Sequence, residues 1–155
     1  MTHLKVGDKA PYFEGKDQDG NDISLETYAG KKLVLFFYPK DDSPGCTKEA
    51  CSIRDHYRVF EKNGYKILGV SPDNEKKHKK FIDKYEFQYP LLADPDKKTI
   101  HAYGLWGPKI FMGKEVIGVH RYTFIINEEG MISHIIDKVK TTDHGIQIAE
   151  AVGIN

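Results

Sequence analysis

The two cysteines of the chain are the residues whose type and spacing are best suited to chemistry. Cys46 and Cys51 are the only cysteines among 155 residues, too few for a disulfide framework. In a cytosolic protein such a pair serves more often as reduced thiols, metal ligands or a redox couple than as a structural bridge. Their presence therefore leaves both redox chemistry and metal chemistry open.

Cys46 stands where a buried strand is predicted to end and a helix to begin. Unpaired N–H groups and the positive end of the helix dipole favour a thiolate at such a place. A free thiol has a pKa of about 8.5, so this stabilisation would raise the nucleophilic fraction at neutral pH. The alternative interpretation is a small apolar residue of the core, because free cysteines often pack there.

Cys51 follows Cys46 by five positions. On an unbroken helix, residues at this spacing have Cα atoms roughly 8.6 Å apart, whereas a disulfide needs Cα atoms within about 7 Å. If the two thiols form a bridge, the first turns of the helix must therefore unwind. A structural zinc site fits poorly, because it needs four ligands and none of the seven histidines lies at metal-pair spacing from these cysteines.

Arg121 is the third residue with potential chemistry. It is one of three arginines against twenty lysines, and it lies within the otherwise apolar stretch 119–126, which predicts a strand. A charge in such a strand needs a partner. A thiolate with polar substrate oxygens would suit the planar guanidinium fork better than it would suit lysine. The alternative is an edge-strand arginine that points into water.

The elements around Cys46 predict a βαβ unit. The apolar run 33–37 has the length of a strand buried on both faces. Ser43-Pro44 then suits the N-cap and first position of a helix, which Asn63-Gly64 would end. The segment 66–70 predicts the next strand, parallel to the first. One apolar stripe follows the helix, formed by Cys46, Ala50, Ile53, Tyr57 and Phe60.

The remaining patterns complete a mixed sheet. A turn cluster at 17–21 predicts an N-terminal hairpin between Phe13 and Ile23. The other expected elements are a charged helix at 76–85 that buries Phe81, Ile82 and Tyr85, a strand at 91–92, a helix from Asp94-Pro95 to Gly104, a hairpin of 122–127 with 131–139, and a final helix capped by Asp143. This order predicts an α/β protein with a thioredoxin-like fold, in which helices flank a mixed central sheet. We expect residues 1–155 to form a single domain.

The composition argues against several classes of protein. Lys plus Arg and Asp plus Glu both number 23, so the chain shows no sign of the basic field that nucleic-acid binding needs. With 39% apolar residues it can build a core, which argues against disorder. No apolar run approaches the ~18 residues of a membrane span, and the first residues lack the apolar segment of a secretory signal. We therefore expect a cytoplasmic protein with neither nucleic acid nor membrane as a partner.

The segments that carry these residues resemble one known family. They are Phe37-Tyr38-Pro39-Lys40, Ser43-Pro44-Gly45-Cys46-Thr47-Lys48-Glu49-Ala50-Cys51, and the stretches 6–13, 103–109, 112–114 and 118–124. Together they resemble peroxiredoxins, and most closely the bacterioferritin comigratory protein or PrxQ subfamily. The similarity spans nearly the whole chain, and the paired cysteines with the distant arginine are its most specific part.

Carried over to this chain, the resemblance implies a thiol-dependent peroxidase that needs no metal or organic cofactor. Cys46 would be the peroxidatic cysteine, and Cys51 the resolving cysteine of an atypical two-cysteine enzyme. Pro39 would shield the pocket. Ser43, where the family usually has threonine, would donate a hydrogen bond to the peroxide. Arg121 would activate the thiol and hold the substrate.

The implied reaction reduces hydrogen peroxide and organic hydroperoxides to water and alcohols. The Cys46 thiolate would become a sulfenic acid and then condense with Cys51 to an intramolecular disulfide. Thioredoxin or a similar dithiol would reduce that disulfide by exchange. We expect a monomer, since no segment carries a clear dimer stripe.

Two other functions are compatible with parts of the pattern. A copper-binding thioredoxin-like module would combine the two thiols with His120, because thiolates and imidazole suit copper. Neighbouring strand residues point to opposite faces, so only one of His120 and Arg121 would face Cys46. A non-catalytic interaction domain of the same fold would have no need for the pairing of Cys46 with Arg121.

Overall fold

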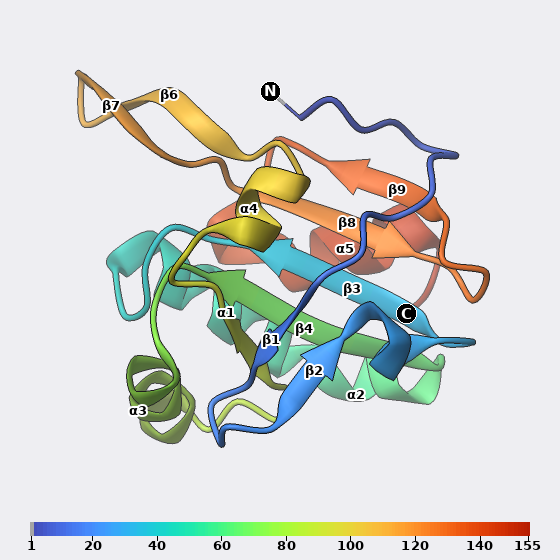
Figure 1. Ribbon diagram of the computed structural model, residues 1–155. Coiled ribbons are helices and arrows are strands. Elements are labelled where there is room, and N and C mark those ends of the chain that lie inside the picture. Colours follow the sequence, from blue (N-terminus) through green and yellow to red (C-terminus); the bar gives the residue numbers. More distant parts are fainter. Residues whose placement is uncertain (1) are drawn as a thin grey trace.

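The computed structural model describes residues 2–155, and within them a sheet of seven strands runs in the order β2-β1-β5-β4-β3-β8-β9 (Figure 1). Strands β3, β4 and β5 are parallel, and the other pairings of the sheet are antiparallel. The mixed α/β architecture predicted from the sequence is thus confirmed.

The strands of this sheet are β1 (Glu14–Lys16), β2 (Asp22–Ser24), β3 (Lys32–Phe37), β4 (Tyr65–Ser71), β5 (Leu91–Ala93), β8 (Tyr122–Ile126) and β9 (Ile132–Ile136). A separate hairpin pairs β6 (Trp106–Phe111) with β7 (Lys114–Val119). The helices are α1 (Pro44–Asp55), α2 (Tyr57–Lys62), α3 (Glu75–Tyr85), α4 (Lys98–Ala102) and α5 (His144–Val152), with short 3-10 turns η1 (Leu25–Tyr28) and η2 (Thr141–Asp143).

Strand β3 is buried on both faces, as its unbroken apolar run predicts. Leu33, Leu35 and Phe37 point into one core, whereas Val34 and Phe36 point into the other. Because side chains alternate across a strand, an apolar residue at every position is what a central strand covered on both sides requires.

The two cores are closed by different helices. Ile100 of α4 packs on the face that holds Leu35. Ala50 of α1, Phe81 of α3 and Ile148 of α5 pack on the opposite face. Figure 1 shows α4 in front of the sheet and α1 and α5 behind it. Helices therefore flank the sheet as predicted, and α1 lies against the strand from which its chain has just emerged.

The helix predicted to run unbroken from Ser43 to Asn63 is divided at His56. The backbone N–H of His56 donates to the Ile53 carbonyl, 3.0 Å away, and its ring Nδ1 lies 3.0 Å from the Ser52 carbonyl oxygen. The imidazole thus takes the acceptor that the next helical hydrogen bond would have used. The expectation of one continuous helix was wrong for this reason.

Two further elements differ from the expectation. The helix predicted to open at Asp94 begins only at Lys98. The Asp94 carboxylate instead reaches forward and accepts from the N–H groups of Thr99 and Ile100 at 3.2 and 2.8 Å. In α3 the fully buried polar residue is His78, which the apolar pattern did not indicate.

The β6–β7 hairpin was not predicted and projects from the body of the protein (Figure 1). Its large apolar side chains are mostly exposed. The alternation of apolar and polar residues that marks a half-buried strand was therefore not available to predict it. The exposed members are Ile110, Phe111, Met112 and Ile117. Within residues 2–155, no helix is both long and apolar enough to cross a membrane.

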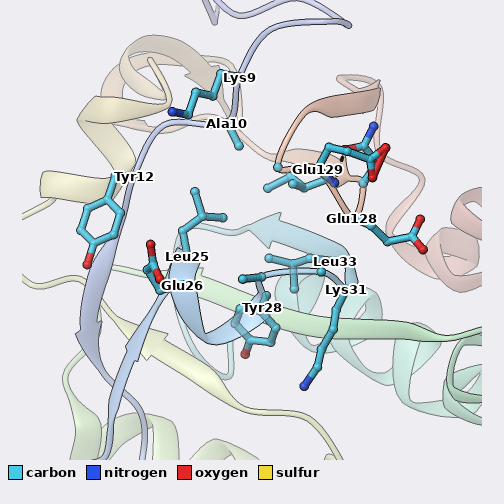
Figure 2. Close-up of a pocket in the computed structure, with 15 residues that line it drawn as sticks. Lys9, Ala10, Tyr12, Leu25, Glu26, Tyr28, Lys31, Leu33, Glu128 and Glu129 are labelled. Atoms are coloured by element: carbon cyan, nitrogen blue, oxygen red, sulfur yellow. Dashed lines mark hydrogen bonds between the residues drawn. The ribbon is translucent and has the colours of Figure 1, made fainter.

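A cavity of about 290 Å³ lies at the end of the sheet where β3 begins and β8 ends (Figure 2). Leu25, Tyr28 and Leu33 line its interior, and Lys31 and Glu128 stand at its edge. Cys46 follows the opposite end of β3. This cavity therefore belongs to a different region from the residues singled out by their chemistry.

Candidate active site

Cys46 lies in the first turn of α1, beyond the carboxyl end of β3. Ser43 is the N-cap residue with extended backbone, and Pro44 is the first helical residue, as predicted. The first helical bond runs from the Thr47 N–H to the Ser43 carbonyl, at 2.8 Å. The N–H groups before it have no partner within the helix. The Cys46 thiol is buried at this positive end of the helix dipole.

Arg121 faces this thiol because of the register of two strands. Phe37, the last residue of β3, pairs with Tyr122, the first residue of β8. The chain that leaves β3 and the chain that enters β8 therefore meet at one edge of the sheet. Arg121 Nη1 lies 3.4 Å from Cys46 Sγ, in hydrogen-bonding geometry.

The predicted strand 119–126 is interrupted where Arg121 lies. Strand β7 ends at Val119 and β8 begins at Tyr122, so Arg121 belongs to the connection between them rather than to the middle of a strand. Gly45 of α1 lies beside the guanidinium, since a Cβ there would be in ordinary contact with Arg121 Nη2 at 3.4 Å. The pairing of Cys46 with Arg121 is thus present, but it is formed by a connection between strands.

Arg121 also binds a carboxylate that the sequence did not reveal. The same Nη1 donates to Glu49 Oε1 at 2.6 Å, and the Glu49 side chain is wholly buried. Burial raises the pKa of Glu49 to about 7, and the Arg121 charge opposes this shift without cancelling it. One guanidinium therefore serves two acids, a thiol and a carboxyl.

Behind Glu49 lies a buried histidine from the C-terminal helix. His144 Nε2 is 3.5 Å from Glu49 Oε2 and 2.6 Å from the Thr123 hydroxyl, while Nδ1 faces Gln147 Oε1 at 2.8 Å. Because Nδ1 must donate to that amide oxygen, a neutral His144 accepts from Thr123 at Nε2. Burial lowers the pKa of His144 to about 4, consistent with a neutral ring. Among the residues described, Glu49 Oε2 has no hydrogen-bond partner.

A cleft of about 750 Å³ opens over Cys46 and has mostly apolar walls. Its lining residues include Pro39, Ser43 and Arg121 on the loop side, and Trp106, Phe111 and Val116 on the β6–β7 hairpin. The predicted site residues Pro39, Ser43, Cys46 and Arg121 thus converge on one cleft.

The Ser43 hydroxyl is already engaged in this structure. Its Oγ donates to the Lys40 carbonyl oxygen at 2.9 Å. In this arrangement the hydroxyl oxygen can accept a hydrogen bond from a ligand in the cleft, whereas donation to the ligand would require rotation about χ1 or of the hydroxyl group. Loss of the methyl group that a threonine would carry makes such rotation easier.

Cys51 lies on the same unbroken helix as Cys46, and both are free thiols. Cys51 is half-buried, and burial raises its pKa. The structure therefore does not bring the two sulfur atoms together, and the helical geometry holds them apart.

His120 does not join Cys46. Its Nε2 contacts the Pro108 carbonyl oxygen at 2.9 Å, whereas Arg121, the next residue, contacts the thiol. In residues 2–155 no group of three or more His, Cys, Asp or Glu side chains is arranged to hold a metal ion. The predicted alternative of a copper site with His120 gains no support from this geometry.

The fold and the site define a thioredoxin-like α/β protein with a thiol held at a helix start against an arginine. The sequence model of the AhpC/TSA family matches residues 6–135, and the chain belongs to this family. Peroxiredoxin Bcp of Escherichia coli K12 is 41% identical over 144 residues, covering 93% of this chain and 92% of that protein.

Solved structures agree with this relationship. The chain is similar to Peroxiredoxin Q of Xanthomonas campestris, with a TM-score of 0.86, 35% identity, and coverage of 98% of this chain and 96% of that one. It is also similar to Peroxidoxin BcpB of Mycobacterium tuberculosis, with a TM-score of 0.85, 32% identity and 97% coverage of both chains. The predicted resemblance is confirmed, and the protein is a peroxiredoxin, a thiol-dependent peroxidase.

The buried acid and imidazole should give the protein opposing dependences of stability on pH. Glu49 holds its proton up to about pH 7 in the folded protein, whereas an unfolded glutamate loses it near a pKa of about 4.3. Between these values the folded state binds more protons, so the free energy of unfolding falls as pH rises. His144 stays neutral down to about pH 4 when folded but charges below about 6.5 when unfolded, so its contribution rises with pH.

Glu49→Gln should remove only the falling contribution. In urea unfolding between pH 4.5 and 7, the free energy of unfolding of the variant minus that of the wild type should increase by up to about 1.4 kcal/mol per pH unit, and it should level off above pH 8. Glu115→Gln, which changes an exposed carboxylate, is the matched control and should give a profile parallel to the wild type. A parallel profile for Glu49→Gln as well would show that Glu49 ionises normally.

Proposed function

We propose that Cys46 is the peroxidatic cysteine of this peroxiredoxin and that Arg121 activates it and binds the peroxide. The observation that carries the proposal is the position of Cys46 Sγ, buried at a helix start, 3.4 Å from Arg121 Nη1, at the floor of a cleft. A helix N-terminus and a guanidinium both favour a thiolate over a thiol.

In the first step the Cys46 thiolate attacks the terminal oxygen of the hydroperoxide. An S–O bond forms and the O–O bond breaks, so sulfur is oxidised to a sulfenic acid and the peroxide is reduced. The departing alkoxide or hydroxide takes up a proton and leaves as alcohol or water. Arg121 and the free N–H groups of the first helical turn would stabilise the negative charge that develops on the peroxide oxygens.

Ser43 and Pro39 would orient the peroxide and exclude water. Ser43 Oγ can accept a hydrogen bond from the peroxide while its own O–H continues to donate to the Lys40 carbonyl oxygen. Pro39 offers no N–H group and forms part of the wall beside Cys46. This arrangement would direct the terminal oxygen toward the thiolate.

The walls of the cleft favour organic hydroperoxides in addition to hydrogen peroxide. Trp106, Phe111 and Val116 provide apolar contacts for an organic group. One of the structurally similar proteins, from Xanthomonas campestris, is described by its alkyl peroxide reduction activity.

In the second step Cys51 would act as the resolving cysteine. Its thiol would condense with the Cys46 sulfenic acid, forming a disulfide and releasing water. A thioredoxin-like dithiol would then reduce this disulfide by exchange and become oxidised itself. We expect this cycle to run in the cytoplasm, in a monomer, with no bound metal or organic cofactor.

Replacement of Cys46 by serine tests the proposal directly. Cys46→Ser should abolish peroxide-dependent NADPH consumption coupled through thioredoxin and thioredoxin reductase, with both hydrogen peroxide and cumene hydroperoxide. Cys51→Ser is the matched control and should still consume one equivalent of peroxide and form a sulfenic acid. Full turnover by Cys46→Ser would refute the assignment.

Arg121→Lys should keep a positive charge but lose the planar fork that reaches the thiol and Glu49 together. Removal of a preorganised donor of this kind costs roughly 10²-fold in rate. Stopped-flow measurement of Cys46 oxidation should therefore show a slower peroxide step. Arg58→Lys, at an exposed position, should react like the wild type, and equal rates for both variants would assign Arg121 a structural role.

The disulfide step predicts a local change of structure. A bridge between Cys46 and Cys51 requires α1 to unwind, so amide hydrogen exchange should be faster in the oxidised protein between about Ser43 and Arg54. Peptides of β4 should remain protected in both forms. Identical exchange in the two forms, or mass spectrometry that finds no such bridge in oxidised protein, would favour a peroxidase resolved by an external thiol.

A further inference from the structure

A second buried polar cluster lies beside the loop that leads from β3 to Cys46. Asp41 of this loop and His78 of α3 contact each other through Oδ2 and Nδ1 at 2.6 Å, and their side chains are 5% and 0% exposed. Neither residue lines the cleft over Cys46. Such buried polar groups are costly to desolvate unless they are hydrogen-bonded, and the peroxidase mechanism described above does not use this pair.

Both ring nitrogens of His78 have a hydrogen-bond partner. Nε2 lies 3.0 Å from the Leu92 carbonyl oxygen, which can only accept, so Nε2 carries a hydrogen. Nδ1 faces Asp41 Oδ2, while Asp41 Oδ1 accepts from the Tyr38 hydroxyl at 2.6 Å. Both oxygens of the Asp41 carboxyl group therefore have a partner. The two residues form a buried hydrogen-bonded pair in which each polar side-chain atom is engaged.

The cluster fixes the backbone of the loop as well as its side chains. The N–H of Asp41 donates to Asp73 Oδ2 at 2.8 Å, and the Ser71 hydroxyl donates to the same oxygen at 2.7 Å. Leu92 belongs to β5, and Ser71 is the last residue of β4. The loop is thus held by α3 and by the ends of two parallel strands.

The backbone fixed at Asp41 lies two residues before Ser43, which lines the cleft over Cys46. Lys40, which precedes Asp41, provides the carbonyl oxygen that receives the Ser43 hydroxyl at 2.9 Å. Asp42, which follows Asp41, has a left-handed backbone with φ of 59°, so the chain turns sharply between Asp41 and Ser43. A shift of Asp41 would therefore reorient the carbonyl that sets the direction of the Ser43 hydroxyl.

We propose that Asp41 and His78 are positioning residues for the peroxide reaction: their buried hydrogen-bonded pair holds the loop in the conformation that presents Ser43 and Pro39 to a peroxide at Cys46. The proposal rests on the proposed role of Cys46 and extends it to residues that do not touch the substrate. Displacements of about 1 Å can cost up to 10²-fold in rate where reacting groups must be aligned.

His78→Gln tests the proposal, because glutamine can fill much of the space but cannot span Asp41 Oδ2 and the Leu92 carbonyl oxygen as the imidazole ring does. The second-order rate of Cys46 oxidation should fall at least tenfold, and the KM for peroxide should rise. Condensation of the Cys46 sulfenic acid with Cys51 should not slow, because that step requires local unfolding around Cys46 and does not depend on the folded loop conformation. Trp106 is the only tryptophan and lines the cleft, so its fluorescence can follow both steps.

Two controls separate positioning from general stability. Lys84→Met removes an exposed contact to the same loop, the 2.7 Å bond to Asp42, and should leave the rate of Cys46 oxidation unchanged. Tyr103→Phe removes the hydrogen bond that the hydroxyl of the buried Tyr103 donates to the Pro11 carbonyl oxygen in the other core, so it should lower the Tm without changing this rate. If His78→Gln is not folded, Asp41→Asn is measured in the same way.

The pair should also show coupling. Since either single change disrupts the contact between these two side chains, Asp41→Asn combined with His78→Gln should slow Cys46 oxidation little more than one change alone. Rates for His78→Gln or Asp41→Asn equal to the wild type, or equal slowing of oxidation and condensation, would overturn the positioning role. Activity retained by Cys46→Ser would instead overturn the proposed function itself.

Discussion

The contact of one guanidinium with two acids is the interaction on which the site depends. Arg121 Nη1 reaches both Cys46 Sγ and Glu49 Oε1, at 3.4 and 2.6 Å. Cys46 and Glu49 are three positions apart on α1, so one helical face presents both groups to the arginine. A thiolate would share the positive charge with the carboxylate, and the proton on Glu49 determines how evenly the charge is shared.

The sheet brings these groups together through its topology. The antiparallel pairing of β3 with β8 places the loop to Cys46 beside the connection that carries Arg121. The parallel pairing of β3, β4 and β5 places Asp41, Asp73 and the Leu92 carbonyl at the same edge. Reactive groups collect at this edge in open α/β sheets because the loops leaving parallel strands converge there.

The sequence predicted the parts of the site that rest on local patterns. Cys46 at a helix start followed from Ser43-Pro44 and the apolar run before it, and Arg121 followed from its rarity in an apolar stretch. Glu49 was missed although it lies on the apolar face that carries Cys46, and a carboxylate on that face was the available signal. His144 and His78 had no such signal, because their partners are distant in the chain: Thr123 for one, and Asp41 and Leu92 for the other. The division of the long helix at His56 depends on a side chain competing for a backbone acceptor, which apolar periodicity does not record.

The place of Glu49 between the two cysteines has a consequence for redox equilibrium. It follows Cys46 by three positions and precedes Cys51 by two, so unwinding of this stretch for a bridge would withdraw the carboxyl from Arg121. In water the carboxyl would recover an ordinary pKa of about 4.3 and release the proton that burial lets it keep up to about pH 7. Closure of the bridge would then liberate a carboxyl proton in addition to those of the thiols. The midpoint potential of the cysteine couple would fall more steeply with pH than thiols alone require, which ties the ease of oxidation to the acidity of the surroundings.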